Sequence, residues 1–216
     1  GDVWVVRIDR SGSVLWQGLR GSAEEEYGVD IDTSSGSLFV LGALRPEYGK
    51  GYGILETYDE GGNLLREKSL REREDFFGAR VVVSSGRVLL SALIEPQAGR
   101  KSLLQVLDFQ FSSRWLKTFD ESPADMAKGF DESIILSGWA ECGKYCSNAM
   151  LRSLSVSGEL EWTRTYADDT GDEPFAVTTV SDGYIVGGQS SPWGSVGEAP
   201  GLSAPTGWDS SNGAGF

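Results

Sequence analysis

Acidic clusters recur along the chain, and their carboxylates are the side chains whose type and spacing point most directly to chemistry. The clusters are Glu24-Glu25-Glu26, Glu72-Arg73-Glu74-Asp75, Asp120-Glu121 with Asp125, and Asp168-Asp169 with Asp172-Glu173. Oxygen ligands that converge on one point can bind Ca²⁺. The candidate ligands of such a calcium site are Glu26, Asp75, Asp125, Asp172 and Glu173.

A structural role is the competing interpretation of these carboxylates, and the sequence favours it. The clusters lack the compact ligand spacing of an EF-hand, and carboxylates placed before a strand cap backbone N–H groups or form turns. The segment Asp30-Ile31-Asp32-Thr33-Ser34-Ser35-Gly36 also resembles a calcium loop. Its place in the repeat described below predicts a strand and hairpin instead.

Two cysteines, Cys142 and Cys146, are the other reactive side chains, and the chain has no histidine. Two thiols alone cannot complete a Cys/His zinc site. We therefore predict a disulfide that closes a small loop, which indicates an oxidising compartment. Without histidine, acid–base catalysis would depend on paired carboxylates, as in glycoside hydrolysis, and neither thiol has a histidine to activate it. We predict no enzymatic activity and no cofactor other than Ca²⁺.

A repeat of about 50 residues must position these side chains. The turn Asp9-Arg10-Ser11-Gly12 leads to Trp16, and related segments place the same anchor position at 66, 115 and 162. Six-residue apolar runs between glycine-containing turns predict strands with both faces buried. Each of residues 24–70, 74–119 and 125–166 yields four strands, named A to D in chain order, and such units bury their apolar faces against one another.

The two ends of the chain supply half a unit each. Residues 3–19 predict strands C and D, and residues 174–188 predict strands A and B. Together they make a fourth unit, so we predict an all-β, four-bladed β-propeller closed by pairing of the N-terminal C/D strands with the C-terminal A/B strands. An eight-bladed ring made by two chains, or a piece of a longer array, remain alternatives. Phe111 replaces a turn glycine and strand A at 126–130 is short, so we expect distortion in that region.

Residues 2–16 and 160–188 resemble the repeats of secreted prokaryotic β-propellers, which are loosely grouped with the quinoprotein-like propellers. The resemblance covers about residues 2–190. It implies a propeller fold and says little about function. In a propeller, Trp16, Trp115 and Trp162 are expected to pack between blades, with an aromatic platform for carbohydrate as the alternative.

The C-terminal tail, residues 191–216, has a different composition from the predicted propeller at 1–190. It is rich in Gly, Ser and Pro and has no strand period, which is typical of a linker. Aromatic and aliphatic anchors are nevertheless spaced along it. We predict that Trp193, Leu202, Trp208 and Phe216 dock on the blades or on a neighbouring subunit.

The charge balance narrows the range of partners. A net charge of −13, from 19 basic and 32 acidic residues, argues against nucleic acid and against anionic membrane surfaces. No apolar run is long enough for a membrane span, and the start at Gly1 is interpreted as the mark of a processed product. We predict a non-catalytic structural or interaction propeller at the cell surface or outside the cell, assembled as a homo-oligomer or filament. The alternative is a propeller that binds or cleaves carbohydrate at its acidic channel mouth.

Overall fold

A computed structural model describes residues 2–21, 25–45, 51–70, 76–94, 101–120, 122–143, 146–166 and 172–190. Almost all of these residues lie in antiparallel strands. Within these ranges, no helix is long and apolar enough to cross a membrane.

The strands recur in the predicted A to D order. The A strands are β3 (Glu25–Ser34), β7 (Phe76–Ser84), β11 (Ser122–Lys128) and β15 (Asp172–Val180). The B strands are β4 (Ser37–Arg45), β8 (Arg87–Ile94), β12 (Ile134–Gly143) and β16 (Gly183–Ser190). The C strands are β1 (Val3–Ile8), β5 (Tyr52–Tyr58), β9 (Lys101–Asp108) and β13 (Cys146–Leu154). The D strands are β2 (Val14–Arg20), β6 (Leu64–Ser69), β10 (Ser113–Phe119) and β14 (Leu160–Tyr166).

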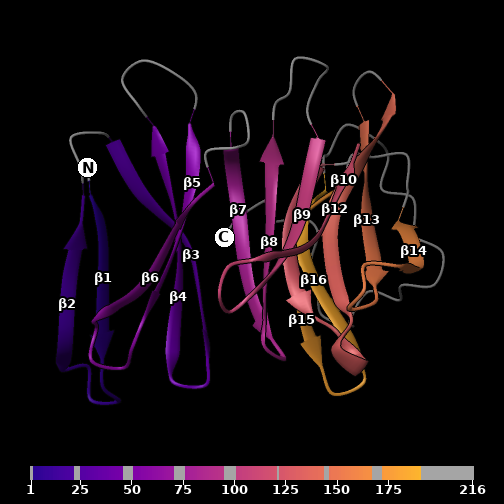
Figure 1. The fold of residues 1–216 in the computed structure, drawn as a ribbon. Helices are drawn as coiled ribbons and strands as arrows, with labels where there is room; N and C mark the ends of the chain where they lie inside the picture. The colour runs from indigo at the N-terminus through magenta and orange to yellow at the C-terminus, as the bar shows by residue number, and fades with distance from the viewer. Residues whose placement is uncertain are drawn as a thin grey trace, which may run out of the picture.

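Three complete blades result from this order. Strands β3–β6, β7–β10 and β11–β14 each form a four-stranded antiparallel sheet with neighbouring strands paired in sequence order, and they stand side by side in Figure 1. We refer to them as the second, third and fourth blades. The predicted strands and their grouping into blades are confirmed.

Neighbouring A strands lie next to each other, so that β3 contacts β7 and β11 contacts β15. Carboxylates on β3 bind the next A strand, because Asp30 Oδ2 accepts the Val81 N–H at 2.8 Å and Asp32 Oδ2 accepts the Val83 N–H at 2.6 Å. This confirms that Asp30 and Asp32 belong to a strand and hairpin rather than to a calcium loop.

The main core lies between the second and third blades. Leu41 and Leu55 of the second blade pack with Val88, Leu90 and other residues of the third blade, and these four side chains are fully buried. The six-residue apolar run at 38–43, predicted to be buried on both faces, lies in β4 and is buried from Phe39 to Ala43. The residues of β5 and β9 are almost all buried as well. Burial of such side chains stabilises the fold by roughly 1.5–3 kcal/mol each.

The distortion expected at Phe111 is absent. Phe111 adopts a φ of 63°, as Gly62 adopts 84° at the equivalent position. The Phe111 N–H donates to Asp108 O at 2.9 Å, and the Gly62 N–H donates to Asp59 O at 3.1 Å. The backbone therefore takes the same turn with either residue, and our expectation of distortion at this position was wrong.

The fourth blade departs from the others at its A–B connection and also has a register shift between Glu141 and Gly143 in its B–C pairing. Its A strand, β11, begins at Ser122, earlier than the sequence suggested. A 3-10 turn, η1 (Phe130–Glu132), then replaces the two-residue hairpin, with positive φ at Asp131 and Glu132.

The two ends of the chain form half-blades. Among the described residues, β1 pairs with β2 and β15 pairs with β16 in separate two-stranded sheets. Figure 1 shows β1 and β2 at one end of the row of blades, away from β15 and β16. We call these sheets the first half-blade and the last half-blade; closure of the ring between them stays a prediction.

Candidate docking surface

Tryptophans join neighbouring blades by lying on glycines of the next C–D turn. Trp16 Nε1 donates to Glu60 O at 2.9 Å, and Trp115 Nε1 donates to Val156 O at 3.1 Å. A Cβ atom on Gly62 would lie 2.7 Å from Trp16 Cδ2. The prediction that Trp16 and Trp115 pack between blades is therefore confirmed.

The joint between the second and third blades uses a different pair at the same positions. Arg66 replaces the tryptophan, and Phe111 replaces the glycine. The guanidinium of Arg66 lies 6.0 Å from the centre of the Phe111 ring, within the range of a cation–π contact. Lys68 Nζ also donates to Phe111 O at 2.9 Å. The D-strand residue and the turn residue that it contacts thus change together: tryptophan contacts glycine, and Arg66 contacts Phe111.

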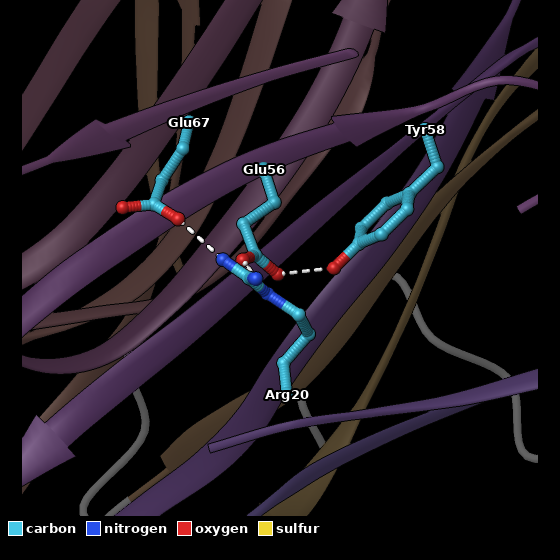
Figure 2. Close-up of polar contacts among 4 residues, drawn as sticks. All are labelled: Arg20, Glu56, Tyr58 and Glu67. Carbon is cyan, nitrogen blue, oxygen red and sulfur yellow. Dashed lines mark hydrogen bonds and ion pairs between the residues drawn. The ribbon is translucent and has the colours of Figure 1, made fainter. Parts of the chain in front are cut away.

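A polar cluster adds charged contacts to the joint between the first half-blade and the second blade (Figure 2). Arg20 of β2 reaches across to β5, where its Nε donates to Glu56 Oε1 at 2.7 Å, and it also pairs with Glu67 of β6. Tyr58 Oη donates to the second oxygen of Glu56 at 2.6 Å. Glu56 is only 3% exposed, so the cluster stabilises the joint and offers no open site for a substrate.

The sequence analysis did not single out this cluster. A glutamate within the mostly apolar strand Tyr52–Tyr58 was the available signal. A charge in a strand buried on both faces requires a partner, but the partner, Arg20, comes from a different blade.

Tyr58 gives the cluster a testable pH dependence. Burial, and then the hydrogen bond to Glu56, raise the pKa of Tyr58 above its ordinary value. The unfolded chain loses this proton above pH about 10, whereas the folded chain retains it, so stability is lost as the pH rises, by about 1.4 kcal/mol per pH unit. We expect the Tyr58→Phe variant to lose less stability than the parent between pH 9.5 and 11.5 in urea unfolding. Equal losses in both proteins would contradict this account of Tyr58.

A groove opens between the first half-blade and the second blade. It has a volume of about 510 Å³, and residues from β1, the β3–β4 hairpin and the turn at Asp59 and Glu60 line it. The structurally equivalent position between the third and fourth blades has a cavity of only about 10 Å³. There, side chains of the third blade's A–B hairpin, such as Val82, Arg87 and Leu89, fill the space. The groove therefore lies where the A–B hairpin of a complete blade would stand, and no described residue fills that space.

Apolar side chains at the half-blades are exposed where complete blades bury the equivalent residue. Ile8 and Ile185 are each 58% exposed. The residues that share the strand register of Ile8 are Tyr58, Leu107 and Leu154, and those that share the register of Ile185 are Phe39, Leu89 and Ile135. All six are between 0% and 5% exposed. The half-blades therefore present faces that this repeat normally buries.

Comparison with known proteins supports the fold. No protein-family model matches the chain, and no curated protein matches it. A subtype N10 neuraminidase-like protein of A/little yellow-shouldered bat/Guatemala matches with a TM-score of 0.50 and 10% identity, over 77% of this chain and 62% of that chain. That protein has a propeller-type fold. The described chain is a β-propeller in its architecture.

A second solved structure matches less well. It is a GH43 beta-xylosidase/alpha-arabinofuranosidase from a compost microbial metagenome, with a TM-score of 0.42 and 10% identity, over 68% of this chain and 63% of that chain. The chain thus spans less than two thirds of the length of either protein.

The described candidate calcium ligands do not meet in one group. Asp125 is engaged, since its Oδ1 accepts Arg80 Nε and its Oδ2 accepts the Val177 N–H, both at 2.8 Å. Glu173 accepts Gln189 Nε2 at 3.0 Å. Glu26 lies near the start of β3 and Asp172 at the start of β15. Within the described ranges, no three acidic or cysteine side chains form a group that could hold a metal ion, and the calcium site stays a prediction.

Other predicted site residues lie outside the described part of the chain. Asp75 precedes β7, and the tail anchors Trp193, Leu202, Trp208 and Phe216 all follow residue 190. The backbone places Cys142 near the end of β12 and Cys146 at the start of β13, where Gly143 pairs with Cys146. The side chains of both cysteines are outside the described set, so the disulfide also stays a prediction.

Proposed function

We propose that this chain is a non-catalytic interaction propeller that self-associates by completing its half-blades. The contrast in exposure at Ile8 and Ile185 is the observation that carries the proposal. Water-exposed apolar side chains on an open sheet edge favour pairing with another strand. Burying each isoleucine would stabilise the associated state by roughly 1.5–3 kcal/mol.

In this proposal a second copy of the chain, rather than the other end of the same chain as the sequence analysis predicted, supplies the strands that complete each half-blade. In the part of the chain that the structure describes, β1 is a C strand with no B strand beside it, and β16 is a B strand with no C strand beside it. The two ends of one chain lie apart in Figure 1, whereas two copies can bring β16 of one against β1 of the next. Such head-to-tail contacts close into a ring when the rotation allows and otherwise continue as a filament. Either outcome fits an assembly outside the cell, with the aromatic tail as a second docking element.

Replacing Ile185 by lysine tests this function. Ile185 is mostly exposed, so we expect the Ile185→Lys variant to fold with little loss of stability and to associate at least about tenfold more weakly. Light scattering over a concentration series measures the association. Leu65→Lys is the matched control, because Leu65 is 57% exposed on β6 of a complete blade. A parent chain that stays monomeric at every concentration, or equal association of both variants, would overturn the proposal.

Carbohydrate binding or cleavage is the second candidate function. The propeller architecture shared with the neuraminidase-like protein supports it. The positions of Glu26 and Asp172 also support it, because both lie near the start of an A strand, in β3 and β15 respectively. A glycan-array screen of the parent chain and of a Glu26→Gln/Asp172→Asn variant separates the two functions. Glycan binding that the double variant loses would favour this candidate.

A further inference from the structure

Each described joint pairs one D-strand residue with one turn residue of the following blade. The pairs are Trp16 with Gly62, Arg66 with Phe111, and Trp115 with Gly158. A tryptophan faces a glycine, and the joint without a tryptophan has a phenylalanine in place of the glycine. The identity of the D-strand residue thus predicts the turn residue of the blade that follows it.

Trp162 occupies this D-strand position in the fourth blade, but the described part of the last half-blade consists of strands A and B and includes no C–D turn. Its ring packs on Tyr184 of β16, with 6.1 Å between the ring centres. By the pattern of the other joints, Trp162 requires a turn glycine that β15 and β16 do not supply.

Gly12 is a turn glycine without a tryptophan. Its φ is 87°, close to the 84° of Gly62 and Gly158, and no atom of the described residues lies within 4 Å of the position that a Cβ on Gly12 would take. The Gly12 N–H donates to Asp9 O at 3.1 Å, as the Gly62 N–H does to Asp59 O. Gly12 therefore has the same turn conformation and the same open face as Gly62 and Gly158, on which a tryptophan ring lies.

We propose that Trp162 of one copy lies on Gly12 of a second copy and that its Nε1 donates to the carbonyl of Arg10. In the two described tryptophan joints, the acceptor is the residue two positions before the glycine, Glu60 or Val156, and Arg10 holds that position before Gly12. The inference rests on the proposed self-association and names the contact that makes it specific.

The complete blades also set the register of the new strand pair. Leu38 lies opposite Tyr58, and Val40 lies opposite Glu56. The equivalent residues place Tyr184 of one copy opposite Ile8 of the next, and Val186 opposite Val6. The two edges then pair along their whole length.

Side-chain sizes support this register. Every complete blade places a small residue of strand B opposite a large residue of strand C. These pairs are Gly42 with Ile54, Ala92 with Leu103, and Gly138 with Met150. The proposed register continues the series with Gly188 opposite Trp4, whose indole is 59% exposed.

A second contact of the joint agrees as well. The last residue of strand D also contacts strand C of the next blade. Arg20 forms an ion pair with Glu56, and the guanidinium of Arg152 lies 4.6 Å from the centre of the Phe119 ring. The same positions at the proposed joint hold Tyr166, which is 52% exposed, and Val6. An aromatic residue meets an aliphatic one, so no buried charge is left without a partner.

Cysteine cross-linking tests the register and the partner together. In a Cys142→Ser/Cys146→Ser background, one chain carries Val6→Cys and another carries Val186→Cys. Mixing them under oxidising conditions is expected to give a cross-linked heterodimer, whereas Val6→Cys with Gly188→Cys, two residues out of register, is expected to give little. A chain that carries both Val6→Cys and Val186→Cys and cross-links only within itself at high dilution would overturn the second copy as partner.

Gly12→Ala tests the contact between Trp162 and Gly12. Gly86 is the matched control, because it also has a positive φ of 78° and no atom near its open Cβ position, but it lies in an A–B hairpin. We expect Gly12→Ala to weaken association at least about tenfold and Gly86→Ala to leave it unchanged. Association that both variants retain, with cross-links in another register, would overturn this joint and leave the proposed function standing. Absence of association in the parent chain would overturn the function itself.

Discussion

Replacing Gly62 by valine is expected to lower the free energy of unfolding by about 3 kcal/mol or more. The left-handed backbone at φ 84° costs an L-residue roughly 1–2 kcal/mol, and a β-branched side chain suffers most. The new Cβ would also lie 2.7 Å from Trp16 Cδ2, and such overpacking costs roughly 1–3 kcal/mol. Urea unfolding monitored by circular dichroism measures the loss.

Gly86→Val separates backbone strain from the clash with Trp16, since Gly86 has a similar φ and open space around it. We expect Gly86→Val to cost clearly less than Gly62→Val. Adding Trp16→Ala to Gly62→Val should recover part of the loss, because the clash disappears. Equal costs for the two valine variants would show that the tryptophan does not hold the joint.

Replacing Arg20 by methionine is expected to cost about 3 kcal/mol of stability. The change keeps the aliphatic stem but leaves the carboxylate of Glu56, 3% exposed, with only the hydroxyl of Tyr58 as a partner. Leaving one member of a buried ion pair uncompensated costs roughly 3–5 kcal/mol, and the partial exposure of Arg20, 40% of its side chain, places the expectation at the lower end. Chemical unfolding of both proteins at neutral pH is the measurement.

Two further variants sharpen the test of this ion pair. Arg114→Ala removes a surface contact with Asp108, in which the arginine side chain is 63% exposed, and should cost no more than about 1 kcal/mol. Glu56→Gln added to Arg20→Met should restore much of the loss, because the third blade carries Gln105 at the equivalent position. A cost of Arg20→Met no greater than that of Arg114→Ala would contradict the proposed role of the cluster.

The strands and blades could be predicted because the same sequence pattern recurs in each repeat. Glycine-containing turns, six-residue apolar runs and the anchor at Trp16 are local features, and several imperfect copies reinforce each other. The expectation failed at Phe111 because a local rule reserves positive φ for glycine. The matching change to Arg66, 45 residues earlier in the chain, stabilises the turn from another blade, and no local pattern reveals it.

The candidate site was predictable only in part, for the same reason. The sequence singled out Asp125 as a candidate calcium ligand or a capping carboxylate, but it could not reveal the partners of Asp125, which are Arg80 and the backbone N–H of Val177, each on a different blade. Arg20 and Glu56 are likewise distant in sequence. The half-blades themselves were visible in the sequence, but the groove beside Trp16 became apparent only when its volume was compared with the filled space between complete blades.

Hydrogen exchange of β1 and β16 over a concentration series tests most directly whether a second copy completes the half-blades. The amides on the open edges of these strands should exchange rapidly in the dilute monomer, and both strands should gain protection together as the chain associates. Rapid exchange at every concentration would contradict completion of the half-blades. Full protection that is already present in the dilute monomer would show that the two ends pair within one chain.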